Sequence, residues 1–390
     1  MPSPYRTDAL ETAGGWVHGY EADPLPPAYG MSPRAALDLI LCEYLRRTPC
    51  MVAFSGGRDS SVLLAAATAV ARREGLPDPV PITLTYPDVP DTDESTWQRQ
   101  VLDHLGLTER VVLVVDDEHD PIGPVAAPLL RAYGVMWPPN VTPTWRMLDA
   151  ARGGALLTGE GGDEVFGLKR ITPLTKTLKS WGRVAPTVYA DTARALAPAA
   201  LRRRAFLRDP YLRPWVRPEV EQILSRRDAD DIAFQSLHAG RGAWQFAARR
   251  CARRGYQTVR ALADDLDVEY LQAFAEPGLV ASVAAAAGFW GWTGRTATMR
   301  ALFGDLLPRS VLERSTKAVF THAVFTERTR EFARGWTGDG VDTALVDPEA
   351  LRRNWLSDSP HAPTMGLLQQ AWLATTVQPV PADPMSIEKP

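Results

Sequence analysis

The chain has 390 residues, of which 45% are hydrophobic and 23% charged, and its formal net charge is −3. This length suits two domains or one large elaborated domain, and the composition is ordinary for a soluble globular protein. The net charge argues against general nucleic-acid binding, which requires a basic surface. No secretory signal or run of transmembrane length is present and the three cysteines form no C-x-x-C pair, so we expect a cytoplasmic protein without membrane or nucleic-acid partners.

The first half of the chain alternates predicted helices and strands. Ser32-Pro33 begins a helix whose apolar face runs from Ala35 to Leu45. Strands are predicted over 51–54, 81–86, 110–115 and 154–157, and further helices over 62–73, 95–105, 126–133 and 144–152. Strands that alternate with helices predict an α/β fold, with a parallel sheet covered on both faces.

From about Ile171 onward the pattern becomes helical, with many Arg and Ala residues and few β-branched runs. The most apolar stretch, 279–292, is short and rich in alanine, which favours a buried helix. The chain then divides into an N-terminal extension (1–31), an α/β core (32–170), a mostly helical part (171–330), and C-terminal helices with a tail expected to be mobile (331–390).

The most informative motif is Ser55-Gly-Gly-Arg-Asp-Ser-Ser61, which stands between a predicted strand and a predicted helix. Its glycines allow a sharp turn that presents backbone N–H groups, and the helix N-terminus adds partial positive charge. Ser55, Ser60 and Ser61 add hydroxyl donors, and Asp59 puts a carboxylate where a divalent cation could bridge to phosphate. Because the Lys-Ser/Thr pair of a Walker loop and the G-x-G-x-x-G spacing are both missing, this is a different kind of phosphate loop.

A second glycine turn, Leu157-Thr-Gly-Glu-Gly-Gly-Asp-Glu-Val-Phe-Gly167, also ends a predicted strand and carries Glu160, Asp163 and Glu164. Such a composition is also common in acidic surface loops. A pair of glycine turns at strand ends, one rich in N–H donors and one acidic, suits a nucleotide with its metal at the carboxyl edge of a parallel sheet.

The first motif resembles the pyrophosphate (PP) loop of the ATP pyrophosphatases. The pair of motifs resembles the synthetase domain of asparagine synthetase and its relatives, which include β-lactam synthetase and the lasso-peptide cyclases. A third block, 299–320, resembles the late segment of that family, and Arg314, Lys317 and Phe320 fall on its positions. The resemblance covers about Ser32 to Phe325.

The resemblance implies an AMP-forming, ATP-dependent carbon–nitrogen ligase, which adenylates a carboxylate and passes the acyl group to an amine or ammonia. It implies ATP and Mg²⁺ as cofactors, with Asp59 and Asp163 as metal ligands. Lys317 would neutralise developing negative charge, and Glu160 would act as the base or orient the amine. The residues implied for the nucleotide are Ser55, Gly56, Gly57, Asp59, Ser60, Ser61, Thr158 and Gly159.

Asparagine synthetase begins with a glutaminase domain whose nucleophile is an N-terminal cysteine, whereas residue two here is Pro2 and about 50 residues precede the first loop. We therefore expect no glutaminase activity. The amine would be free ammonia, ammonia from a separate amidotransferase, or an amino group on a small-molecule or peptide substrate, with a carrier as another potential partner. This favours a role in specialised-metabolite or peptide biosynthesis.

Two alternatives remain at this point. Another PP-loop ATP pyrophosphatase, such as a tRNA-modifying enzyme, would normally use a loop cysteine and a basic surface. A non-catalytic nucleotide-binding homologue conflicts with the retained Asp59, Asp163, Glu160 and Lys317. Arg58 fills a variable loop position, and it either contacts phosphate or faces outward.

Overall fold

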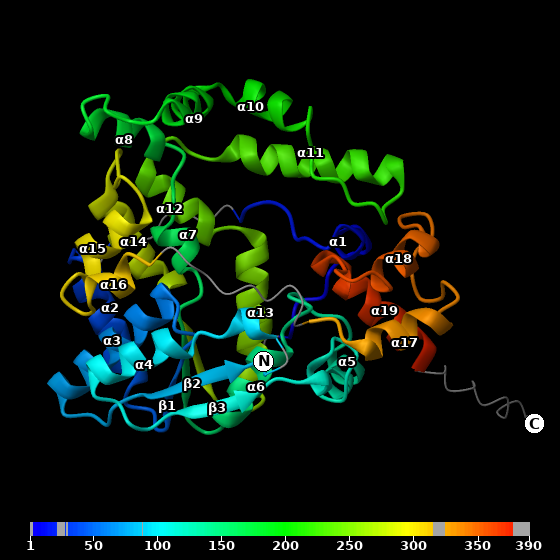
Figure 1. Ribbon diagram of the computed structural model, residues 1–390, viewed down its shortest axis with the longest axis horizontal. Coiled ribbons are helices and arrows are strands. Elements are labelled where there is room, and N and C mark those ends of the chain that lie inside the picture. Colours follow the sequence, from blue (N-terminus) through cyan, green and yellow to red (C-terminus); the bar gives the residue numbers. More distant parts are fainter. Residues whose placement is uncertain (1–2, 22–27, 29, 88, 315–323, 377–390) are drawn as a thin grey trace, which may run out of the picture.

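The computed structural model describes residues 3–21, 28, 30–87, 89–314 and 324–376. It contains a five-stranded parallel sheet in the order β3-β2-β1-β4-β5. Figure 1 labels β1, β2 and β3 of this sheet. The strands are β1 (Cys50–Ala53), β2 (Val80–Thr85), β3 (Val111–Val114), β4 (Ala155–Thr158) and β5 (Glu269–Gln272). The first four lie where the sequence predicts strands, with ends shifted by one residue, so the α/β parallel-sheet class is confirmed.

The strand β5 corrects the sequence analysis, in which the pattern after Ile171 was helical. It pairs in parallel with β4, with Leu156 opposite Tyr270 and Leu157 opposite Leu271. Tyr270 and Leu271 are 0% and 3% exposed. A four-residue strand is too short to display a clear periodicity, so the tertiary pairing with β4 decides its conformation.

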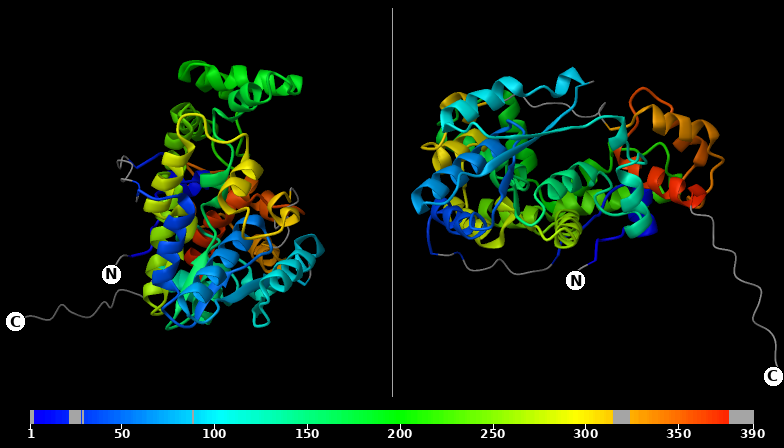
Figure 2. Two further views of the ribbon diagram at one scale, coloured as in Figure 1. Left: turned by 90° about the vertical axis from the view of Figure 1, so that its left-hand side faces the viewer. Right: turned by 90° about the horizontal axis from the view of Figure 1, so that it is seen from below.

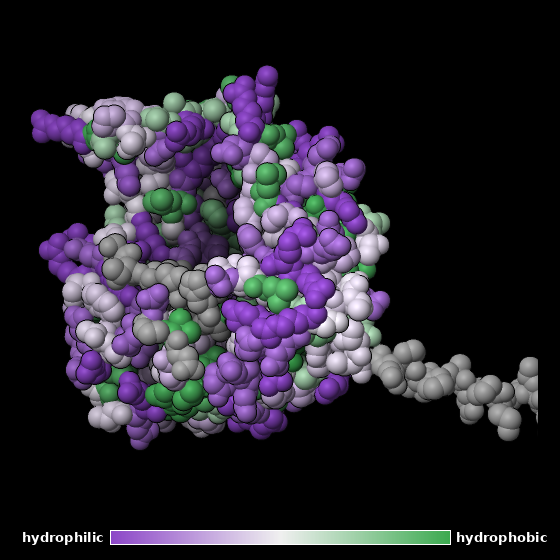
Figure 3. Space-filling view, turned by 45° about the vertical axis from the view of Figure 1, so that its right-hand side comes forward, coloured by the Kyte–Doolittle hydropathy of each residue, from purple (hydrophilic) through white to green (hydrophobic). Residues whose placement is uncertain are grey.

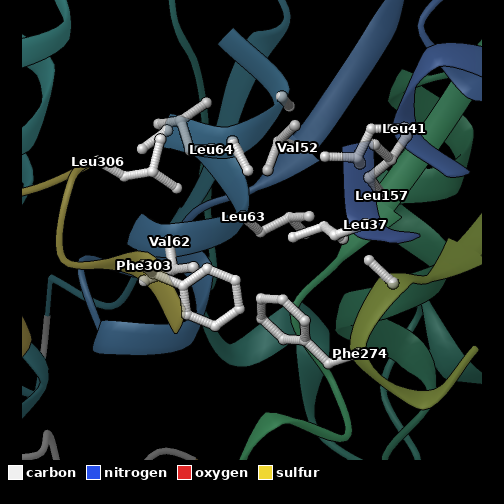
Figure 4. Packing of buried hydrophobic residues seen from close by; sticks show 14 of the residues in the cluster. Leu37, Leu41, Val52, Val62, Leu63, Leu64, Leu157, Phe274, Phe303 and Leu306 are labelled. Carbon is white, nitrogen blue, oxygen red and sulfur yellow. The ribbon is translucent and has the colours of Figure 1, made fainter. Parts of the chain in front are cut away.

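One face of the sheet is covered by α2 (Pro33–Tyr44), α3 (Arg58–Glu74) and α14 (Pro277–Ala287). The helix α3 carries three consecutive alanines, 65–67, that are at most 1% exposed, so it can approach its neighbours closely. Figure 4 shows Leu37 and Leu41 from α2 packed with Leu63 and Leu157 in this core. The expected helix over 279–292 ends earlier, at Ala287, because Gly288 adopts φ 54°.

The opposite face is covered by α6 (Thr142–Ala150) and α13 (Arg250–Asp264). Leu148 of α6 and Leu262 of α13 are fully or almost fully buried against Ile82 and Leu156 of the strands. The sheet is therefore the middle layer of three, as expected for parallel strands.

The remaining helices surround these layers and extend beyond them. They are α1 (Ala9–Gly14), α4 (Ser95–Leu105), α5 (Ala126–Tyr133), α7 (Gly162–Phe166), α8 (Thr172–Lys179), α9 (Pro186–Leu196), α10 (Ala199–Phe206), α11 (Pro218–Phe234), α12 (Ala239–Ala247), α15 (Arg295–Phe303), α16 (Arg309–Leu312), α17 (Glu327–Gly335), α18 (Pro348–Trp355) and α19 (Met365–Thr376). Among the described residues, no helix is both long and apolar enough to span a membrane.

A second hydrophobic core lies away from the sheet. It joins α1 and α11 to α17, α18 and α19, and Trp215 and Trp355 are completely buried in it. The helices α8 to α10 lie at one end of the molecule (Figure 2). The space-filling view shows the molecule hollowed between these helices and the part that holds the sheet (Figure 3).

Candidate active site

The two glycine motifs meet at the carboxyl edge of the sheet. The first follows β1 and the second follows β4, and these strands are neighbours, with Met51 opposite Leu156. A Cβ atom on Gly162 would lie 2.5 Å from Cγ of Asp59, so only glycine permits this approach. The structure therefore brings Asp59 and the acidic turn together from positions about a hundred residues apart.

The first loop presents polar groups around an uncapped helix N-terminus. Gly56 adopts φ 82°, which glycine tolerates best, and no side chain caps α3. The Ser55 and Ser60 hydroxyl oxygens lie 3.1 Å apart, and the Gly57 N–H donates to Ser55 Oγ over 3.3 Å. Ser61 Oγ is buried and finds no hydrogen-bond partner in the described parts of the chain. Hydroxyl groups and a helix N-terminus with free donors form a suitable cradle for an anion.

Asp59 and Asp163 are joined by Arg295, the first residue of α15, which the sequence analysis did not single out. Arg295 donates from Nη2 to Asp59 Oδ2 and from Nη1 to Asp163 Oδ1. The guanidinium thus bridges the two predicted metal ligands, one from each motif.

The carboxylate of Asp59 retains unused binding capacity. Its Oδ1 atom is buried and has no hydrogen-bond partner among residues 3–21, 28, 30–87, 89–314 and 324–376, although Oδ2 accepts from Arg295. Burial raises the pKa of Asp59, and the positive charge of Arg295 opposes that shift. A buried carboxylate oxygen without a donor is favourable only when a cation or another donor reaches it.

These two carboxylates fit Mg²⁺ bound together with a nucleotide. Mg²⁺ is usually held by one or two carboxylates plus phosphate oxygens and waters. Within the described ranges, no group of three or more His, Cys, Asp or Glu side chains could hold a metal on its own. A metal held by these two carboxylates would therefore need further donors, such as phosphate oxygens or waters, and Asp59 Oδ1 is one oxygen that could reach it.

Glu160 lies at the end of β4 and contacts the unpredicted strand β5. Gln272 donates from Nε2 to Glu160 Oε2 over 2.5 Å. The Glu160 side chain is accessible to solvent, yet it is surrounded by enough protein that desolvation raises its pKa, while Gln272 opposes the shift. A carboxylate of raised pKa is better suited than an ordinary one to accept a proton near neutral pH.

Thr158 and Gly159, which the family resemblance implies for the nucleotide, directly precede Glu160, and Thr158 is the last residue of β4. The Thr158 side chain is buried, and its Oγ1 lies 3.3 Å from the hydroxyl of Tyr270. A Cβ atom on Gly159 would lie 3.2 Å from the carbonyl carbon of Asp59, so this residue packs directly against the first loop.

Arg314, from the third predicted block, contacts the first loop. It donates from Nη1 to the Gly56 carbonyl over 2.9 Å and from Nη2 to Glu94 over 2.5 Å, and it lies over the ring of Trp97. This buried arginine therefore holds the glycine turn in place. Lys317 and Phe320, from the same block, lie outside the described residues.

Comparison with known families agrees with this arrangement. The chain matches the asparagine synthase family over residues 44–375. It belongs to the asparagine synthase family. This is a family of ATP-dependent amide-forming synthetases, whose substrates are a carboxylate and an amine or ammonia. The match extends beyond the predicted limit near Phe325 and takes in α17 to α19. No curated protein matches the sequence.

Three residues near the site of this asparagine synthase family member were missed by the sequence analysis. Gln272 is the last residue of β5, and the strand-like run 268–271 was too short to predict a strand there. Arg295 had only the preceding Gly294 as a local signal, because its partners are 236 and 132 residues away. Lys169 resembles an ordinary surface lysine in the sequence.

Lys169 stabilises the end of the second motif. Its Nζ donates to the carbonyl oxygens of Glu164 over 2.7 Å and Gly167 over 3.2 Å, at the C-terminus of α7. Burial lowers the pKa of Lys169 to about 8. A cation at this helix end complements the partial negative charge of the carbonyls and fixes the turn that carries Asp163.

Arg58 is directed toward α15 instead of outward. It donates from Nη1 to Thr296 Oγ1 over 3.1 Å. Burial and the nearby Arg295 lower the pKa of Arg58. The sequence analysis left its orientation open, and the structure places it beside Arg295 at the first loop.

Proposed function

We propose that this protein adenylates a substrate carboxylate with ATP, releases pyrophosphate and transfers the acyl group to an amine or ammonia. The observation that carries the proposal is the contact between two glycine turns, one with uncapped N–H and hydroxyl donors and one acidic, at adjacent strand ends. A site of this kind suits a nucleotide triphosphate with its metal.

Adenylation solves a chemical difficulty of the carboxylate. Its negative charge repels nucleophiles and its oxygen is a poor leaving group, whereas AMP is a good one. The residues around the first loop would bind the departing pyrophosphate through Ser55, Ser60 and the N-terminus of α3. Such preorganised donors stabilise charge that grows in the transition state.

Asp59 and Asp163 would hold Mg²⁺, which neutralises phosphate charge when it is bound. Support comes from the position of both carboxylates against one bridging cation, the guanidinium of Arg295. Both side chains are also partly reachable from solvent, with exposed fractions of 16% for Asp59 and 49% for Asp163.

Glu160 would accept the proton that the attacking amine must lose, or orient that amine. Its raised pKa and solvent access support this role, because a base must reach the substrate and retain affinity for a proton. Gln272 fixes the carboxylate through its Oε2 atom.

Lys317 would neutralise negative charge on phosphate or on the tetrahedral intermediate. Indirect support comes from Arg314, three residues earlier, which contacts the Gly56 carbonyl of the first loop. Removal of such an electrostatic contact reduces the rate by about a hundredfold or more.

The acyl acceptor is free ammonia, ammonia from a separate amidotransferase, or an amino group on a small molecule or peptide. A peptide or specialised metabolite would suit the hollow between α8–α10 and the sheet-bearing part of the molecule (Figure 3). The protein would then act in a specialised biosynthetic pathway in the cytoplasm.

The experiment is incubation of the purified protein with ATP, Mg²⁺ and a panel of carboxylic acids, each with ammonium or a panel of amines. Mass spectrometry would detect AMP, pyrophosphate and the amide, and ATP–pyrophosphate exchange would reveal adenylation even without the right amine. Formation of ADP and phosphate, or equal AMP formation by a folded Asp163→Asn variant, would contradict the proposal.

A further inference from the structure

The guanidinium of Arg295 lies where the two acidic ligands converge. Each of its terminal nitrogens donates to a different carboxylate, one to Asp59 and one to Asp163, and Nε has no hydrogen-bond partner in the described structure. This differs from the bidentate fork with which arginine usually holds a single carboxylate. The side chain acts as a bridge between the two motifs.

A guanidinium and Mg²⁺ cannot both lie between these two carboxylates, because two cations at such a short separation repel each other. Asp59 Oδ1 still has no donor among the described residues, so Arg295 does not satisfy every oxygen of the two carboxylates. Arg295 therefore keeps the pair of acids stable without saturating them. A divalent ion would saturate them only if the guanidinium left.

A second arginine at the same place favours an anion as the next partner of Arg295. Arg58, at the start of α3, lies beside it, and both burial and the positive charge of Arg295 lower the pKa of Arg58. Two neighbouring guanidinium groups are stabilised by an anion between them, and the uncapped N-terminus of α3 adds donors for it. Phosphate oxygens meet this requirement.

Arg295 can change its position without opening the core. Its side chain is 20% exposed, and it belongs to the first turn of α15, directly after Gly294. Asp163 is 49% exposed, so an incoming ion can reach the bridge from solvent.

We propose that Arg295 is a built-in counter-ion, which fills the cation position in the nucleotide-free protein and passes to the nucleotide phosphates when MgATP enters. This inference rests on the proposed function. The exchange keeps every charge paired, because Mg²⁺ takes the carboxylates while the phosphates take the guanidinium, and an unpaired buried charge is strongly unfavourable. It follows that the protein excludes the metal alone and admits it with the nucleotide.

The first test uses Mn²⁺ alone, without nucleotide, with free Mn²⁺ measured by electron paramagnetic resonance. Arg295→Gln should create one Mn²⁺ site at least about tenfold tighter than any in the parent, because the competing charge is gone. Asp163→Asn in the same background should abolish that site. The matched control is Arg300→Gln, on the same helix and paired with Glu313, which should bind Mn²⁺ as the parent does.

The second test measures binding of a non-hydrolysable ATP analogue in the presence of Mg²⁺. Arg295→Gln should bind the analogue about tenfold or more weakly, because the phosphates lose a guanidinium. The variant should therefore bind Mn²⁺ more tightly and the ATP analogue more weakly than the parent. A merely structural role of Arg295 would weaken the binding of both. Shifts of the same sign, or unchanged Mn²⁺ affinity, overturn the inference.

Arg295→Lys covers the case in which Arg295→Gln does not fold. The lysine keeps the positive charge but cannot donate to both carboxylates as the guanidinium does. It should therefore bind Mn²⁺ alone with an affinity between those of the parent and Arg295→Gln. If it excluded Mn²⁺ as strongly as the parent, the inference would be overturned. Failure of the proposed function is recognised separately, because then the parent itself binds no ATP analogue and forms no AMP, whatever the variants do with Mn²⁺.

Discussion

Asp59 at the sheet edge and Asp120 beside the second hydrophobic core are both largely removed from solvent, but their carboxylates have different surroundings. Asp120 is 0% exposed and accepts four hydrogen bonds, from the N–H groups of Ile122 and Thr326 and from the hydroxyls of Thr326 and Thr329. Within the part of the chain that the structure describes, Asp59 has Arg295 as the side-chain partner of Oδ2 and no partner for Oδ1.

The difference separates a structural carboxylate from one available for binding. The four donors around Asp120 connect the chain near residue 120 to the start of α17 and satisfy both oxygens. A fully satisfied buried group stabilises a fold, while a buried oxygen that lacks a donor is a cost that a ligand can remove. The same residue type therefore serves stability in one region and ligand binding in the other.

The largest expected effect is that of Asp59→Asn on catalysis. AMP formation should fall about a hundredfold or more, which corresponds to a barrier increase of about 3 kcal/mol. The thermal midpoint should change little, because the amide removes a buried charge while Arg295 retains Asp163. The measurements are initial rates and thermal unfolding, and a variant as active as the parent would end the proposed role of Asp59.

Asp120→Asn should give the reverse pattern. The amide places an N–H group against donors, so we expect the free energy of unfolding to fall by about 2–3 kcal/mol. Urea denaturation measures this loss, and the rate per folded molecule should equal that of the parent. If instead catalysis fell while stability held, the distinction between the two aspartates would be wrong.

A smaller effect is expected on the pH dependence of the reaction. Desolvation raises the pKa of Glu160 and the hydrogen bond from Gln272 lowers it. A base must be deprotonated, so activity should be lost as the pH falls through that raised pKa. Gln272→Leu removes one contact that lowers the pKa of Glu160, so it should move this acid limb to higher pH.

The matched control for that shift is Gln100→Leu, since Gln100 donates to the exposed Ser310 hydroxyl of α16 over 2.8 Å. Its pH–rate profile should coincide with that of the parent. An acid limb that stays in place or moves to lower pH in Gln272→Leu would exclude Glu160 as the titrating base.

The smallest effect is expected far from both aspartates. Arg203 and Asp230 form an ion pair of 2.5 Å whose side chains are 40% and 60% exposed. Solvent screens such pairs, so Arg203→Ala should lower the free energy of unfolding by less than about 1 kcal/mol and leave the rate unchanged. Urea denaturation measures this loss of stability, with which the loss in Asp120→Asn is compared. If Arg203→Ala lost as much free energy of unfolding as Asp120→Asn, the contrast between the two sites would disappear.

The sequence alone determined strands β1 to β4 of the central sheet and the pairing of the glycine turns. Strands β1 to β4 are apolar runs bounded by turn residues, and such a pattern of consecutive residues can be recognised from the sequence. Because parallel strands end at one edge, the residues after β1 and β4 were expected to meet, and Asp59 does lie against Gly162 and share Arg295 with Asp163.

Only the tertiary structure decided which other side chains complete the site. Gln272 reaches Glu160 from a strand that forms by pairing with β4, and Arg295 reaches Asp59 across 236 residues of sequence. No local sequence pattern marks the role of either residue, because each acquires that role from a partner that folding of the chain brings close. Backbone conformation follows from neighbouring residues, whereas the electrostatic surroundings of a carboxylate depend on packing between distant segments.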